Sequence, residues 1–272
     1  MLALQDTYTL RVKAAFHGRW KRRYGLWSVL AAMLWVPVMA RPLDIYVENA
    51  STPWSNPDGT GYANRQVSAA FAATNTPINL VVVPYKRCKL MVMSGQGGAC
   101  FSMSWEPAMK GLIQFADQPL YEVEAQVFKT DREKYPRVDS LAQIPRGRTV
   151  GIVNGYEYPE SVSRLGQQGI HFDVSASEAI ALRKLKAGRI DFAVIFVDPV
   201  KTSQTIIKDA HAEGVAFAFS AGKQGSYIGF SLTHADGLKA KRLFDKGFAT
   251  IKQNGMLAQM MTDWNIRSLI VH

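Results

Sequence analysis

Aromatic and acidic side chains follow the first two apolar runs of this sequence, which are candidate strands. Glu48 comes directly after the first run, and Trp54 and Tyr62 lie in the Pro-, Ser-, Asn- and Gly-rich stretch that continues from it. Tyr85 follows the second run. An aromatic face offers a ligand stacking and an attraction for cations of about 0.5–2 kcal/mol, and a carboxylate pairs a ligand cation or a neighbouring lysine. These residues are candidates for contact with a small polar molecule, and packing of the loop itself is the alternative for the rings.

Hydroxyl side chains lie at the end of the next apolar run, residues 99–103, and a basic residue precedes this run. Ser102, Ser104 and Trp105 lie at its end, where hydroxyl groups are good orienting donors for a ligand. Arg87 offers a guanidinium that can hold a carboxylate with two parallel hydrogen bonds. A surface salt bridge at a helix start is the alternative for Arg87.

The second half of the chain repeats this pattern of polar side chains after apolar runs. Tyr156 and Tyr158 follow the run at 149–153, and Asp198 follows the run at 190–197. Ser177 precedes a helical pattern. We expect its side chain to cap that helix, with anion binding at the same amides as the alternative.

Enzyme and metal signatures are sparse in the sequence. It contains no HExxH, GxSxG or phosphate-loop pattern. Between the leader and the terminal residue, the histidines are His171, His211 and His234, which are scattered singly. We therefore expect no catalytic residue, no metal and no cofactor.

The first forty residues have the pattern of a secretory signal peptide. Lys21, Arg22 and Arg23 precede an uncharged apolar run, 26–38, and small residues end the segment at Ala40. The run is shorter than the roughly 20 apolar residues of a membrane span. We predict a cleaved signal over 1–40 and export to the periplasm, and an uncleaved anchor is the alternative.

The charge of the remaining chain does not predict nucleic-acid binding. Six of the 32 Lys and Arg residues and one of the 22 Asp and Glu residues fall in 1–40, which leaves a net charge of +5. This modest excess forms no cluster interleaved with aromatic residues. We expect no nucleic-acid partner and a monomeric protein.

Cys88 and Cys100 are the two cysteines. An even pair in an oxidising compartment suggests a disulfide. If 86–93 is a helix and 99–103 the following strand, however, Cys88 lies at the far end of the helix from the turn. A disulfide needs Cα atoms within about 7 Å. We therefore favour two buried thiols, with the disulfide as the alternative.

Beyond residue 40, short apolar runs alternate with helical patterns. This order builds parallel sheets covered by helices on both faces. We predict an α/β fold of two lobes, the first over 41–128, the second over 129–228, and a return to the first over 229–272. The expected strands are 45–47, 78–83, 99–103, 124–129, 149–153, 170–174, 190–197, 215–219 and 227–232.

Several short motifs, taken in order, resemble a family 3 extracellular solute-binding protein, the amino-acid-binding component of ABC transporters. No single motif is specific, but the set extends over nearly all of the chain after the leader. The motifs are Thr52-Pro53-Trp54 with Gly61-Tyr62, the run from Val83 to Arg87, the stretch from Phe115 to Tyr121, Asn154-Gly155-Tyr156, the LKAGRID of 185–191, and the closing stretch from Asn254 to Trp264.

The resemblance implies a type II periplasmic binding fold with a ligand cleft between lobes joined by two crossover strands, near 124–129 and 225–232. It places Ser102, Ser104 and Trp105 where the family hydrogen-bonds an α-carboxylate. The family's key arginine is missing, and Met109 or Lys110 occupies its place. The ammonium-binding aspartate would fall near Phe196, with Asp198 as the closest acid. The α-amino-acid signature is therefore incomplete.

These expectations lead to one favoured function and two alternatives. The favoured one is a periplasmic receptor that closes on a small polar, amino-acid-like ligand and delivers it to an ABC transporter permease. An enzyme on the same fold, dehydratase-like, would use Glu48 or Asp198 as general acid or base. A sensory or partner-binding module would lack a transporter.

Overall fold

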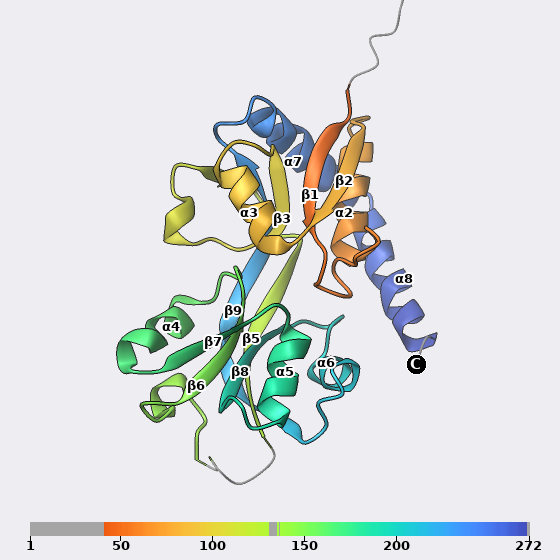
Figure 1. Ribbon diagram of the computed structural model, residues 1–272. Coiled ribbons are helices and arrows are strands. Elements are labelled where there is room, and N and C mark those ends of the chain that lie inside the picture. The colour runs from red at the N-terminus through yellow and green to blue at the C-terminus, as the bar shows by residue number, and fades with distance from the viewer. Residues whose placement is uncertain (1–40, 131–134, 136, 271–272) are drawn as a thin grey trace, which may run out of the picture. The chain divides into compact units, whose positions relative to one another are not determined.

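The computed structural model describes residues 41–130, 135 and 137–270 (Figure 1). The expected signal segment lies outside these residues. The described strands form one sheet with the order β2-β1-β3-β9-β5-β8-β6-β7, and β4 also pairs with β9. Their bounds are β1 (Leu43–Glu48), β2 (Ile78–Val83), β3 (Ala99–Met103), β4 (Ile113–Phe115), β5 (Tyr121–Thr130), β6 (Thr149–Val153), β7 (His171–Ser175), β8 (Phe192–Val197) and β9 (Val215–Ser231).

Helices separate most of the strands along the chain. They are α2 (Tyr62–Ala72), α3 (Tyr85–Met93), α4 (Glu160–Ser163), α5 (Glu178–Lys186), α6 (Ser203–Asp209), α7 (Gly237–Gln253) and α8 (Met256–Ile270), with 3₁₀ turns at Pro107–Met109, Leu141–Gln143 and Arg164–Gln168. The predicted cap is confirmed, because the Ser177 hydroxyl accepts a hydrogen bond from the amide of Ile180 at 3.4 Å.

Two groups of elements are joined by the long strands β5 and β9. We call β1–β4 with α2, α3, α7 and α8 the first lobe, and β6–β8 with α4–α6 the second lobe. The chain passes between them along β5 and β9, which pair antiparallel from Tyr121 opposite Ser226 to Thr130 opposite Val215. Figure 1 shows these two strands side by side between the two sets of labelled strands.

The core of the first lobe joins segments from both ends of the described chain. Ala240, Phe244, Phe248 and Ile251 form a buried apolar stripe on α7. Phe244 packs on Phe71 of α2 with ring centroids 5.7 Å apart. A Cβ at Gly247 would lie 1.8 Å from the carbonyl oxygen of Ala70, so only glycine allows the two helices to approach this closely. These contacts hold α2 and α7 together.

The cysteines form a disulfide, and the favoured expectation of two thiols is wrong. Cys88 and Cys100 are bonded, with Cα atoms 5.8 Å apart. Cys88 is the fourth residue of α3, and a helix rises only about 1.5 Å per residue. The helix therefore places Cys88 only a short distance along its axis from Met93, within reach of the second residue of β3.

The structure also contains elements that the sequence patterns did not predict. The expected strands 215–219 and 227–232 are one continuous strand, β9, and β4 and α6 were not predicted. In the described part of the chain, no helix combines the length and the apolar character needed to cross a membrane.

Candidate functional site

A small cavity lies where the two lobes and the two linking strands meet. We call it the interlobe pocket. Its volume is about 30 Å³, which holds water but not a solute of several heavy atoms. Its walls are Glu48, Ser51, Trp54, Ser102 and Ser104 of the first lobe, Tyr156, Glu157 and Phe196 of the second lobe, and Tyr121, Val123, Gln224 and Ser226 of β5 and β9.

Glu48 is a buried carboxylate at the end of β1. Its side chain is 3% exposed, and its Oε1 accepts a hydrogen bond from the Tyr156 hydroxyl at 2.6 Å across the pocket. Burial is the main reason why the pKa of Glu48 rises to about 7. Glu157 and Glu178 raise it further, and the Tyr156 hydrogen bond and Lys201 work against the shift. Glu48 is therefore a titratable group near neutral pH inside the pocket.

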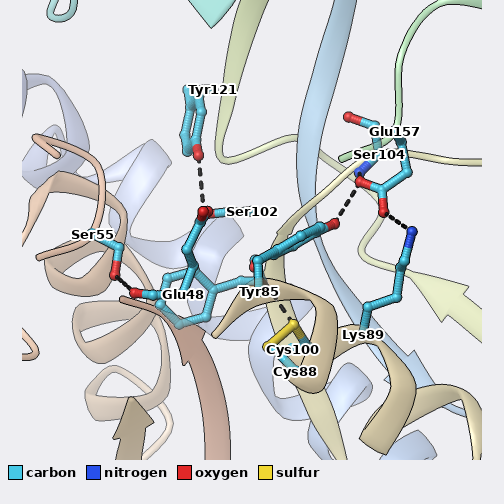
Figure 2. Close-up of a disulfide and its surroundings, with 11 residues drawn as sticks. Glu48, Ser55, Tyr85, Cys88, Lys89, Cys100, Ser102, Ser104, Tyr121 and Glu157 are labelled. Carbon is cyan, nitrogen blue, oxygen red and sulfur yellow. Dashed lines mark hydrogen bonds and ion pairs between the residues drawn. A yellow bond between two sulfur atoms is a disulfide. The ribbon is translucent and has the colours of Figure 1, made fainter. Parts of the chain in front are cut away.

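Glu157 is the second buried carboxylate of the pocket, and α3 supplies its partners (Figure 2). Lys89 Nζ lies 2.9 Å from its Oε1, and the Tyr85 hydroxyl donates to its Oε2 at 2.5 Å. The backbone amide of Ser104 donates to the same oxygen at 3.1 Å. Lys89 also bonds Glu106 and the carbonyl of Gly155. The Glu157 ion pair thus ties the second lobe to the first, and it holds the pKa of Lys89 above its usual value against the opposing effect of burial.

Trp54 of the first lobe contacts polar and charged side chains of the second lobe. Its indole Nε1 donates to Asp198 Oδ2 at 2.7 Å. One contact of its ring is stacking on Tyr121 at 5.0 Å between centroids, and another is Lys201 Nζ at 4.3 Å from the centroid. Lys201 itself forms a buried ion pair with Glu178. The aromatic ring is therefore already in contact with a cation from this chain.

Hydroxyl and amide groups line the floor of the pocket. Ser102 has a positive φ of 66°, at an irregularity in the β3–β9 pairing, and its hydroxyl accepts a hydrogen bond from Tyr121 at 3.0 Å. Irregularities of this kind redirect a side chain. Gln224 donates to the Ser104 hydroxyl at 3.0 Å and to the Glu157 carbonyl at 2.7 Å. These groups are orienting donors and acceptors for a polar ligand.

Five residues expected from the sequence line the pocket, and seven do not. Glu48, Trp54, Ser102, Ser104 and Tyr156 line it. Two of the other seven form hydrogen bonds with residues that line the pocket. Tyr85 donates to Glu157, and Asp198 accepts from Trp54. The hydroxyl of Tyr158 accepts from the amide of Val153, and its ring stacks on Phe196.

The remaining four expected residues lie away from the pocket. Tyr62 packs on Trp264 of α8 at 5.9 Å between ring centroids, a contact with a distant helix and not with its own loop. Arg87 is exposed and lines a shallow depression beside Lys86 and Asn154. Trp105 is 60% exposed, and Lys110 is exposed at a turn.

Sequence reasoning missed seven of the residues that line the pocket, which are Ser51, Tyr121, Val123, Glu157, Phe196, Gln224 and Ser226. Glu157 stands between the two tyrosines that were singled out, so its alternation with them was an available signal. Phe196, on β8, lines the pocket at the position that the resemblance gives to an ammonium-binding aspartate.

Comparison with known proteins shows the fold. No protein-family model matches the sequence, and no curated protein matches it either. The structure is similar to the crystal structure of a histidine kinase sensor domain with similarity to periplasmic binding proteins. The TM-score is 0.70 and the identity 19%, over 82% of this chain and 96% of that chain. The arginine-, lysine-, histidine-binding protein ArtJ from the thermophilic bacterium Geobacillus stearothermophilus gives a TM-score of 0.69 and 13% identity, over 82% and 95%.

A third similar structure is the ancestral amino acid-binding protein AncCDT-1, a precursor of cyclohexadienyl dehydratase. Its TM-score is 0.65 at 13% identity, over 82% of this chain and 94% of that chain. The chain has the two-lobed type II periplasmic binding protein fold. This confirms the architecture expected from the resemblance to family 3 solute-binding proteins.

Proposed function

We propose that this protein is a binding protein that captures a small polar solute in the interlobe pocket without changing it chemically. The observation that carries the proposal is the origin of the walls of the pocket. Both lobes and both linking strands contribute hydrogen-bonding or aromatic side chains to a single cavity. In open α/β sheets, such a crevice at strand ends is the usual place for a ligand.

Closure of the lobes is the mechanism that this arrangement supports. Among the described residues, hydrogen bonds cross between the lobes from Trp54 to Asp198 and from Tyr156 to Glu48. Tyr85 and the Ser104 amide donate to Glu157, and Lys89 donates to the carbonyl of Gly155. A hydrogen bond contributes about 1 kcal/mol net, so a ligand that adds contacts to both lobes shifts the equilibrium toward closure. The small cavity implies that a solute enters when the lobes are apart.

The biological setting belongs to the same proposal. A periplasmic receptor that works as a monomer and delivers its solute to an ABC permease fits the fold and the predicted signal segment. A sensory role would use the same pocket and differ in the partner. Binding of the protein to a permease encoded nearby supports import, and loss of a signalling response on deletion supports sensing.

The second candidate function is an enzyme, and the burial and pKa of Glu48 support it. A buried carboxylate with a pKa of about 7, hydrogen-bonded to the Tyr156 hydroxyl, has the properties of a general acid or base at neutral pH. Mass spectrometry of a bound compound after incubation separates the two candidates. Recovery of the compound unchanged supports the receptor, and turnover supports the enzyme.

Thermal unfolding of the purified protein against amines, amino acids, organic acids and small peptides tests the proposed function. A compound at 100 times its dissociation constant adds about 2.7 kcal/mol to the free energy of unfolding. Trp54→Ala should weaken the response, and Trp105→Ala, which removes an exposed indole outside the pocket, is the matched control. A folded protein that responds to no compound would contradict the proposal.

A further inference from the structure

The charges around the interlobe pocket are unbalanced. Two carboxylates, Glu48 and Glu157, are among its lining residues, and no lysine or arginine of the described chain lines it. Glu157 is compensated, because Lys89 lies 2.9 Å from its Oε1. Glu48 is the carboxylate that lacks such a partner.

Among the residues that the structure describes, no unpaired cation acts on Glu48. Its Oε1 is bonded to the Tyr156 hydroxyl, and among the described contacts no hydrogen bond or ion pair reaches its Oε2. The charged groups that act on it are Glu157, Glu178 and Lys201. Lys201 is paired with Glu178, so these two charges largely cancel. Glu48 is 3% exposed and lines the cavity without a positive partner. A buried, ionised carboxylate without such a partner is unfavourable, and a cation in the cavity would stabilise it.

The other walls also suit a cation. The rings of Trp54, Tyr121, Tyr156 and Phe196 line the cavity, and aromatic faces attract positive charge. Lys201 already makes such a contact with Trp54, so the other three rings are the ones that can serve a ligand. Hydroxyl groups of Ser102 and Ser104 can accept or donate the remaining hydrogen bonds.

A ligand carboxylate, by contrast, finds no charge partner here. The basic residues expected to hold one, Arg87 and Lys110, are exposed and do not line the pocket. Lys89 and Lys201 are already paired with glutamates. Desolvating an anion beside Glu48 without a cation is unfavourable because like charges repel at low dielectric.

We propose that the ligand of this pocket is a small organic cation without a carboxylate group, such as an amine or a guanidine, whose positive nitrogen lies against Glu48. This inference rests on the solute-binding function proposed above and narrows its ligand class. The resemblance suggested an amino-acid-like ligand. The ligand proposed here has the amine but not the carboxylate of an amino acid.

Matched pairs that differ only by a carboxylate test the inference. Calorimetric titrations of the purified full chain at pH 8 compare ethanolamine with serine, putrescine with ornithine, and agmatine with arginine. We expect at least one amine to bind at least tenfold more tightly than its amino acid. If an amino acid binds as tightly as its amine or more tightly, the cation inference is overturned and the solute-binding function stands. If no compound of either series binds but another compound of the thermal-unfolding panel does, the cation inference is overturned and the solute-binding function stands. If nothing in the whole panel binds, both proposals fail.

Glu48→Gln and a change of pH locate the cation. The substitution should weaken the amine at least tenfold, whereas Glu122→Gln, the same change at an exposed residue of β5, should leave it unaffected. If the amine binds the ionised form of Glu48, its affinity should be about tenfold lower at pH 6 than at pH 8. The pH dependence should disappear in Glu48→Gln. An unchanged affinity in Glu48→Gln would overturn the placement against this residue.

Discussion

The two carboxylates of the pocket are buried to a similar degree but have opposite environments. Glu157 accepts from Tyr85 and Ser104 and is paired with Lys89, whereas Glu48 has one neutral donor, Tyr156. The first arrangement satisfies a buried charge and links the lobes. The second leaves a buried acid whose ionisation is costly. Burial raises the pKa of Glu157 as well, but Lys89 lowers it and pairs with the carboxylate. A structural role accounts for that ion pair, and we ascribe the absence of a cation at Glu48 to the ligand proposed above.

Lys89→Met should give the largest effect, because it removes the cation from the satisfied carboxylate. Breaking a buried ion pair by deleting one partner costs about 3 kcal/mol. We expect a loss of that size in the free energy of unfolding, measured with urea at pH 7. Lys186→Met is the control, since it breaks an exposed pair with Glu213 and should cost less than about 1 kcal/mol. Equal losses in the two variants would mean that the Glu157 network is no stronger than a surface pair.

Glu48→Gln should stabilise the protein, and more so at high pH. The pKa of Glu48 is about 7 in the folded state and 4.5 in its ordinary state, so the folded form favours the neutral acid. The resulting stability is fully present below pH 4.5 and is lost as the pH rises through 7, by about 3 kcal/mol in all. The gain from Glu48→Gln should therefore be about 2 kcal/mol larger at pH 8 than at pH 5.

Urea unfolding of the ligand-free protein at the two pH values measures this difference. Glu122→Gln on the exposed face of β5 provides the reference for a change of glutamate to glutamine. A gain from Glu48→Gln that does not depend on pH would show that Glu48 is as well satisfied as Glu157.

Trp54→Phe should give the smallest effect. The variant retains an aromatic ring for stacking on Tyr121 but loses the hydrogen bond to Asp198, whose other oxygen still accepts from the amides of Val200 and Lys201. We expect a loss of about 1 kcal/mol in stability and a larger radius of gyration in small-angle scattering. The exposed Trp105 provides the control substitution, Trp105→Phe. If the scattering curve of Trp54→Phe is unchanged, this hydrogen bond does not contribute to closure.

The short apolar strands were predictable from the sequence, whereas the continuity of the linking strand β9 was not. The runs at β2, β3 and β6 have the predicted bounds, because a strand of a largely parallel sheet reads as a short apolar run. β2 is nevertheless an edge strand without a fully buried residue. The middle of β9 is polar and contains Gly222 and Gly225, so its local pattern resembles a turn. Pairing with β5 keeps this segment extended. This is a tertiary contact that a local pattern does not contain.

The candidate site divides in the same way. Residues at the ends of predicted strands, such as Glu48 and Tyr156, could be placed because strand ends meet at one edge of a sheet. Gln224 could not, since it belongs to the polar middle of β9. The sequence also could not predict the direction of a side chain. Tyr85 and Trp105 are both aromatic residues near strand ends, but Tyr85 is buried against Glu157, whereas Trp105 is exposed.

The packing of α7 on α2 also means that the first lobe cannot complete its core until nearly the whole chain is available. Phe71 and Ala70 come early in the chain, but their partners, Phe244 and Gly247, follow only after the whole second lobe. A chain that stops before α7 therefore leaves an apolar face of α2 uncovered, although every strand of the second lobe is present. Such exposed apolar surface makes an incomplete chain prone to aggregation.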